Sequence, residues 1–287
     1  MMKTVKIVTD STADIPLYLQ KELDISVVPL TVHFGEDSYE DGVDLTSGEF
    51  YEKLTSTQDI PTTSQPTPHQ FETVYRRLHE EYNQSDIISI HLSSKLSGTF
   101  QSSYIASQTL GDEVPVTVVD SKRASYAIGV IIVELATLAQ AGASKKVCMD
   151  RLSELLEDTN VYFMVDTLEY LEKNGRIGKA SAILGSLLKI KPILSLNPEG
   201  EVYPFEKVRG KKKAVQRIIQ ELTDKYGDAD LHIGISHAEA KDEAIEVMKQ
   251  LHEHFSIKKE VITDIGPVIG THVGPGTLSI AVTKMKS

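Results

Sequence analysis

Two short segments rich in serine and threonine carry the side chains best suited to chemistry. One covers residues 62–66 (TTSQP), and the other covers residues 91–99 (HLSSKLSGT). Hydroxyl and backbone N–H groups donate hydrogen bonds and bind anions well, but without a metal or an activating base they break bonds poorly. We therefore expect a binding protein that holds a carboxylate at one end of an otherwise apolar ligand.

The second segment is expected where a buried strand ends at Ser93 and Ser94 and a helix begins. Ligands of open α/β sheets bind at the carboxyl ends of the strands, and the N–H groups of a helix N-terminus suit an anion. The hydroxyls of Ser94, Ser97 and Thr99 could donate to a ligand or simply cap the helix. The spacing favours neither interpretation.

Two further segments complete the predicted site. Thr62 and Thr63 lie in a polar loop predicted over residues 55–68, from which a second hydroxyl would reach the carboxylate. Residues 266–276 hold four glycines and two prolines, which predicts a turn with a close backbone approach. His272 lies within it and could orient a hydroxyl or contact the carboxylate.

Composition restricts the class of protein. The chain has 287 residues, 40% of them hydrophobic, and a net charge of −11, which disfavours binding to nucleic acid. Its one cysteine, Cys148, excludes internal disulfides and multi-cysteine metal sites, and the histidines are too scattered for a metal centre. The longest apolar run, residues 126–141, is too short for stable membrane insertion. We expect a cytoplasmic protein without a metal or cofactor.

The order of the predicted elements indicates an α/β fold with two domains. Strands at residues 5–9, 25–32, 86–92 and 114–120 alternate with helices, which predicts a mostly parallel sheet flanked by helices. After a boundary near residue 160, the pattern predicts a C-terminal α/β domain with a mixed sheet. The domains are therefore 1–160, with the carboxylate-binding loops, and 161–287, with the ligand between them. Residues 126–141 and 180–194 are apolar enough to line a tunnel, although most of them are expected to pack the core.

Six segments resemble the DegV family, in order, from residue 5 to about 284. They are residues 10–14 (DSTAD), 63–66 (TSQP), 93–99 (SSKLSGT), 120–122 (DSK), 166–177 (DTLEYLEKNGRI) and 270–276 (GTHVGPG). The family is similar to the lipid-binding subunit of bacterial fatty acid kinase. The resemblance implies a two-domain fold that holds one long-chain fatty acid such as palmitate. It implies no enzyme activity in the chain alone, and a role in lipid transport or fatty acid metabolism.

The resemblance also implies roles for particular residues. Thr63 and Ser94 would bind the carboxylate with support from His272, and the neighbouring hydroxyls of Thr62 and Ser93 leave open which atoms make the contact. Two basic features, Arg176 and residues 209–213 (RGKKK), have two interpretations. They form a solvated surface, or Arg176 and Arg209 contact a partner kinase or the acyl phosphate that it makes.

Two other functions stay open at this point. A serine-dependent acyl hydrolase or transferase would use Ser94 or Ser97 as nucleophile and His272 as base, but the chain has no Gly-x-Ser-x-Gly elbow. A regulatory protein would act through protein partners. A Walker-type phosphate loop is absent, so a chain that presents a fatty acid to a kinase would depend on that partner to use ATP.

Overall fold

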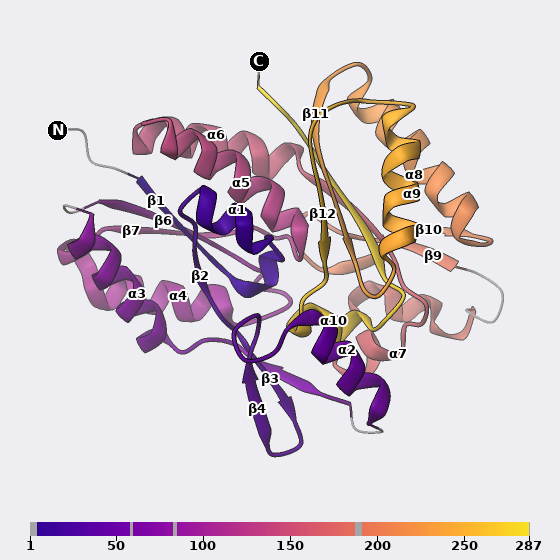
Figure 1. The fold of residues 1–287 in the computed structure, drawn as a ribbon, viewed down its shortest axis with the longest axis horizontal. Helices are drawn as coiled ribbons and strands as arrows, with labels where there is room; N and C mark the ends of the chain where they lie inside the picture. The colour runs from indigo at the N-terminus through magenta and orange to yellow at the C-terminus, as the bar shows by residue number, and fades with distance from the viewer. Residues whose placement is uncertain (1–4, 58–59, 83–84, 187–190, 287) are drawn as a thin grey trace.

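The computed structural model describes residues 5–57, 60–82, 85–186 and 191–286. It is an α/β fold, as the sequence predicts, with one parallel and one mixed sheet. Figure 1 shows the parallel sheet on the left, the mixed sheet on the right, and a small third sheet below them.

The first sheet has four strands in the order β2-β1-β6-β7, and every neighbouring pair is parallel. All six residues of β1 are buried, as expected for a strand covered on both faces. The strands are β1 (Val5–Asp10), β2 (Ser26–Val28), β6 (Asp86–His91) and β7 (Val116–Asp120).

Helices cover both faces of this sheet. Helices α3 and α4 pack on one face, and α5 packs on the other with α6 behind it. The start of α3 is fixed by a reciprocal pair of hydrogen bonds between Thr67 and Gln70. The helical segments are η1 (Ser11–Ala13), α1 (Leu17–Glu22), α3 (Pro68–Glu81), α4 (Thr99–Leu110), η2 (Gly111–Glu113), α5 (Tyr126–Gln140) and α6 (Lys145–Asp158).

The second sheet has six strands in the order β10-β9-β8-β13-β11-β12. Among the pairs formed by its described residues, β11–β12 alone is parallel, and β9 and β10 form an antiparallel hairpin. Helices α8 (Lys211–Tyr226) and α9 (Lys241–His252) cover its outer face. The strands are β8 (Asn160–Met164), β9 (Lys191–Leu196), β10 (Val202–Val208), β11 (Asp230–His237), β12 (Ser256–Asp264) and β13 (Leu278–Lys284).

Helix α5 lies between the two sheets and contacts both. Its apolar residues are buried almost all round, which is the pattern of a core helix. The ring of Tyr126 packs against Gly234 of β11. The one acidic residue of the helix, Glu134, hydrogen bonds to His232 at 2.9 Å and forms an ion pair with Lys259 at 2.9 Å.

The small third sheet was not expected. Residues 25–32 were predicted as one strand, but the chain breaks at Pro29, which has no backbone N–H for a ladder. The predicted loop over residues 55–68 also contains a short strand, which pairs with the second half of the broken strand. The antiparallel order is β4-β3-β5, with β3 (Thr31–Phe34), β4 (Asp37–Glu40) and β5 (Thr62–Ser64).

The glycine-rich segment near the C-terminus was predicted as a turn, but Pro267–Val273 is a helix, α10. Proline at the first helical position and Gly274 after the last one are ordinary helix boundaries. Within the apolar segment 180–194, the chain forms part of the 3-10 helix η3 (Gly178–Ser186), and residues 187–190 lie outside the described residues. The remaining helices are α2 (Ser47–Ser56) and α7 (Glu169–Lys173).

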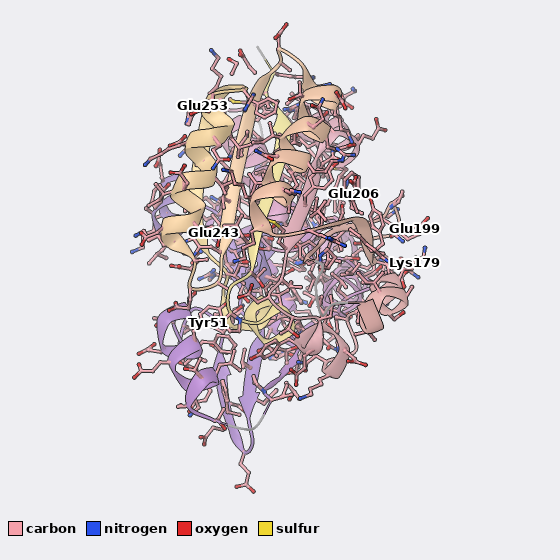
Figure 2. All side chains as sticks on the ribbon, turned by 90° about the vertical axis from the view of Figure 1, so that its right-hand side faces the viewer. Tyr51, Lys179, Glu199, Glu206, Glu243 and Glu253 are labelled. Carbon is pink, nitrogen blue, oxygen red and sulfur yellow. The ribbon has the colours of Figure 1, made fainter. Side chains whose placement is uncertain are left out.

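Helix α10 lies at a junction, where it contacts β3 and β5 of the small third sheet and also α2, α7 and η1. Tyr51 of α2 lies at this junction, where the purple helix meets the yellow one in Figure 2. Its hydroxyl donates to the carbonyl of Ile265, 3.2 Å away, just before α10 begins. This contact positions α10 beside the small third sheet.

Candidate ligand-binding site

An apolar cavity opens where α10, β5 and the turn after β6 meet the inner face of the second sheet. It encloses about 830 Å³, open solvent at its mouth included. Its apolar wall comes from many short stretches and includes Leu30, Leu92, Phe163, Leu196, Val202 and Val268. The two long apolar segments were expected to line a tunnel, but none of their described residues lines this cavity. They pack into the cores instead.

Thr63 and His272 meet at the wall of this cavity. In β5, successive side chains point to opposite faces, so Thr63 turns toward the cavity while Thr62 is exposed. Its Oγ1 atom lies 2.9 Å from the Nε2 atom of His272, on α10. The Nδ1 atom of His272 is buried and has no hydrogen-bond partner among the described residues.

The serine-rich turn contributes Ser97 to the cavity. Helix α4 begins only at Thr99, three residues later than the start expected at Leu96, so residues 93–98 form a turn. The Ser97 hydroxyl pairs with that of Thr99 at 2.9 Å and accepts from its N–H. Gly98 allows Gln65 to approach, because a Cβ at that position would lie 3.0 Å from the Gln65 amide nitrogen.

Arg176 brings a positive charge to the same wall. Its Nε donates to the carbonyl of Leu96 at 3.0 Å, and its Nη1 donates to the carbonyl of Asn174 at 2.7 Å. The amide of Asn174 in turn donates to the carbonyl of Thr271, on α10. These bonds fix the guanidinium between the serine-rich turn and the helix that carries His272.

The electrostatics of the site favour a neutral imidazole. Burial, together with the neighbouring charge of Arg176, lowers the pKa of His272 to about 4. The imidazole is therefore uncharged at neutral pH, with one N–H donor and one acceptor nitrogen. The site thus presents hydroxyl donors, a neutral histidine and one fixed cation, which suits a single carboxylate.

Other predicted residues lie elsewhere. Ser93 is buried, and its hydroxyl donates to the carbonyl of Gly200 at 2.8 Å, so it joins the turn to the β9–β10 hairpin. Ser94 is exposed and does not line the cavity. Arg209 is also exposed, in the turn before α8, and lies outside the cavity wall. Ser97 is therefore the serine that the fold brings to Thr63 and His272.

Sequence reasoning missed four polar residues of the cavity wall, which are Gln65, Ser125, Thr277 and Ser279. Gln65 lies two residues after Thr63, and that position was its one available signal. Ser125 and Ser279 lie at the start of α5 and in β13, where nothing in the local pattern marks a ligand. Their place in the wall depends on how the two sheets pack.

The same geometry bears on the other functions considered. The Nε2 atom of His272 pairs with Thr63, and no hydrogen bond joins this histidine to Ser94 or Ser97 in the structure. No cluster of three or more His, Cys, Asp or Glu side chains that could hold a metal occurs within the described residues. None of the described helices combines the length and apolar character needed to cross a membrane.

The fold and cavity define an α/β protein with a ligand-sized pocket beside two sheets, and the chain belongs to the DegV family. Residues 4–285 match this family, which is described as an uncharacterised protein family. A DegV domain-containing protein of Halalkalibacterium halodurans is 39% identical over 281 residues, which are 98% of each chain.

Solved structures of the family agree with the fold. A DegV family protein from Thermus thermophilus, described by its fatty acid binding, superposes with a TM-score of 0.92 at 35% identity, over 98% of this chain and 100% of that one. DegV of Bacillus subtilis, a fatty acid binding protein, gives 0.88 at 35% identity, over 99% of this chain and 100% of that one. The resemblance predicted from the sequence is confirmed.

Proposed function

We propose that this protein binds one long-chain fatty acid, with the carboxylate at Thr63, Ser97, His272 and Arg176 and the acyl chain in the apolar cavity. The hydrogen bond between Thr63 and His272 at the wall of that cavity carries the proposal. Two solved relatives that are described as binding fatty acids support it.

The chemistry of the polar end explains how a carboxylate would be held. If the Nε2–H of His272 donates to the Thr63 oxygen, the Thr63 hydroxyl proton is available for the carboxylate. Arg176 adds a positive charge that is already fixed by two backbone carbonyls, so little side-chain freedom would be lost on binding. Hydrogen bonds to a charged group each contribute about 1.5–3 kcal/mol.

The apolar wall would supply the rest of the affinity. Each methylene group removed from water contributes about 0.8 kcal/mol, so a long acyl chain contributes more than its headgroup. The wall is mostly apolar with a few convergent polar groups, as small-molecule sites are.

The experiment is to remove bound lipid from the purified protein, add palmitate, and record a native mass spectrum. We expect one palmitate per chain, and Thr63→Val should reduce the occupancy at limiting palmitate. The matched control is Thr62→Val, a change at the exposed neighbour in the same strand. Absence of palmitate from the wild-type spectrum would refute the proposal.

We further propose that the protein presents the carboxylate to a separate kinase, as the family resemblance implies. The cavity is open at its mouth, and Arg209 is exposed at the head of the basic run 209–213. A basic surface suits an acidic partner or the phosphate that such a partner transfers. The chain itself carries no phosphate-binding loop of the Walker type.

This second proposal is tested with palmitate-loaded protein, ATP and the purified catalytic subunit of a bacterial fatty acid kinase. Acyl phosphate formation is measured by trapping with hydroxylamine as the acyl hydroxamate. We expect product only when all three are present, and less product with Arg209→Ala. Equal product from free palmitate without this protein would exclude a presenting role and leave the binding proposal intact.

A further inference from the structure

The inner face of the second sheet carries a strip of three serines, Ser125, Ser236 and Ser279, which we call the serine strip. Ser236 of β11 and Ser279 of β13 are directly opposite in the register of the sheet, so their side chains share a face. Ser125 immediately precedes α5, and its Oγ lies 2.9 Å from the Oγ of Ser236. The strip is therefore built by three separate elements.

Two members of the strip form part of the cavity wall. Ser125 and Ser279 line the cavity, whereas Phe163, the other register partner of Ser279, makes the wall apolar beside them. None of the three serines contacts Thr63, Ser97 or His272 through a hydrogen bond in the structure. The strip is thus a second polar surface within a cavity whose wall is otherwise mostly apolar.

The hydroxyl of Ser279 is the unusual feature of this strip. The residue is 5% exposed, and its hydroxyl has no hydrogen-bond partner among the described residues. Its neighbour Thr277, also in the wall, already donates to the carbonyls of Val273 and Gly274. Ser279 therefore keeps one donor and two acceptor sites directed at whatever occupies the cavity.

A plain alkyl chain would not satisfy this hydroxyl. Burying a polar group without a partner is unfavourable, whereas a ligand hydroxyl or oxo group would pair with it. We propose that the serine strip is a second polar subsite, which takes a hydroxyl or oxo group carried on the acyl chain. This inference rests on the proposed function and specifies its ligand class as hydroxylated or oxo fatty acids.

The hydrogen bonds behind the strip favour a neutral substituent. The Ser125 hydroxyl donates to Asp14 at 2.5 Å, and Asp14 also accepts from the N–H of Gly266 at 2.9 Å. Burial raises the pKa of Asp14 well above its usual value. The three side chains of the strip are themselves uncharged hydroxyls, so they form no ion pair with a second carboxylate or an ammonium group, and a hydroxyl or oxo group is the better match.

The experiment compares palmitic acid with a set of monohydroxypalmitic acids that carry the hydroxyl at different carbons. Dissociation constants are measured by competition against a fluorescent fatty acid on delipidated protein. One positional isomer should bind about tenfold more tightly than the isomers with the hydroxyl elsewhere, because in that isomer alone the hydroxyl pairs with Ser279. The preferred carbon would report the position of the strip along the chain.

Ser279→Ala should remove the preference, so that the dissociation constant of the favoured isomer rises to that of the other isomers. The matched control is Ser195→Ala, which removes a buried serine hydroxyl that donates to the carbonyl of Val161 and does not line the cavity. Binding of palmitic acid with no preferred isomer, or a preference that survives Ser279→Ala, would overturn this inference alone. If neither palmitic acid nor any isomer binds, the proposed function fails and the subsite fails with it.

Discussion

The Nε2 atom of His272 lies 2.9 Å from the hydroxyl of Thr63, although 209 residues separate them in the chain. Strand β5 and helix α10 are packed against each other, so the pair is set by the backbone and not by a flexible loop. Its consequence is that the hydroxyl of Thr63 has a fixed direction before any ligand arrives.

The first prediction concerns this pair. Thr63→Val should weaken palmitate binding by about 10- to 100-fold, because it removes the donor to the carboxylate and leaves His272 without its partner. Thr63→Ser should retain most of the affinity. Isothermal titration calorimetry on delipidated protein measures both, and an unchanged dissociation constant for Thr63→Val would contradict the assignment.

The second prediction separates the two serines of the turn. Ser97 lines the cavity and Ser94 is exposed, so Ser97→Ala should weaken binding several-fold, whereas Ser94→Ala should leave it within about twofold. The same titration serves for both variants. The reverse order would mean that the turn rearranges to bring Ser94 to the ligand, as the family resemblance implies.

The third prediction concerns His272 and acid. Its pKa in the folded protein is about 4, below the ordinary value for histidine, so the unfolded chain takes up a proton that the folded protein does not. As the pH falls from about 6.5 to about 4, this residue should lower the free energy of unfolding by a few kcal/mol. Urea denaturation over this range measures the free energy of unfolding of wild type and of His272→Gln. The difference between these two free energies should narrow as the pH falls.

The fourth prediction concerns Asp41 and has the opposite sign. Burial raises the pKa of this carboxyl to about 7, and its Oδ2 atom has no hydrogen-bond partner among the described residues. The unfolded chain loses its proton near pH 4 while the folded protein keeps it, so stability should fall as the pH rises from about 4 to about 7. Asp41→Asn should abolish this loss, and near pH 8 it should exceed wild type in the free energy of unfolding. A parallel pH dependence in both proteins would show that Asp41 titrates normally.

The fifth prediction concerns the packing of α5 on the second sheet. A Cβ at position 234 would clash with the ring of Tyr126, so Gly234→Ala should destabilise the protein by about 1–3 kcal/mol. The control is Gly48→Ala in α2, where nothing lies within 4 Å of the added carbon and alanine should stabilise the helix by about 0.5–1 kcal/mol. Thermal unfolding measures both changes in stability, which should be a lower melting temperature for Gly234→Ala and a higher one for Gly48→Ala.

The elements with strong periodicity could be predicted from the sequence. Strand β1, the core helix α5 and the amphipathic helix α8 all lie where their apolar patterns indicate. The hairpin β9–β10 also follows from its turn residues. In each of these, local pattern and tertiary burial agree, so local reasoning is sufficient.

Elements with weak local signals were missed. The three residues of β5 are all hydroxylated and form a strand only because β3 supplies their hydrogen-bond partners. None of the seven residues of helix α10 is a strong helix former, and packing against α2 and α7 stabilises it. Both elements carry site residues, so local reasoning was least successful at the site.

The site was predicted in part for the same reason. Three segments were expected to converge, and Thr63, Ser97 and His272 do lie along one cavity. The choice among neighbouring hydroxyls could not be made, because it depends on which side of β5 and of the turn faces inward. The apolar wall could not be predicted either, because it is assembled from single residues of many elements and not from the long apolar segments.

The position of α5 has a consequence for how the chain can be divided. One side of this helix packs against the parallel sheet, and the other side packs against the mixed sheet. Cleavage of the polypeptide near residue 160 would leave α5 with the N-terminal fragment, where one apolar side of the helix would be exposed to water. The C-terminal fragment would lose the helix that covers the inner face of the mixed sheet. We expect neither fragment to fold alone, and the two halves to melt in a single cooperative transition.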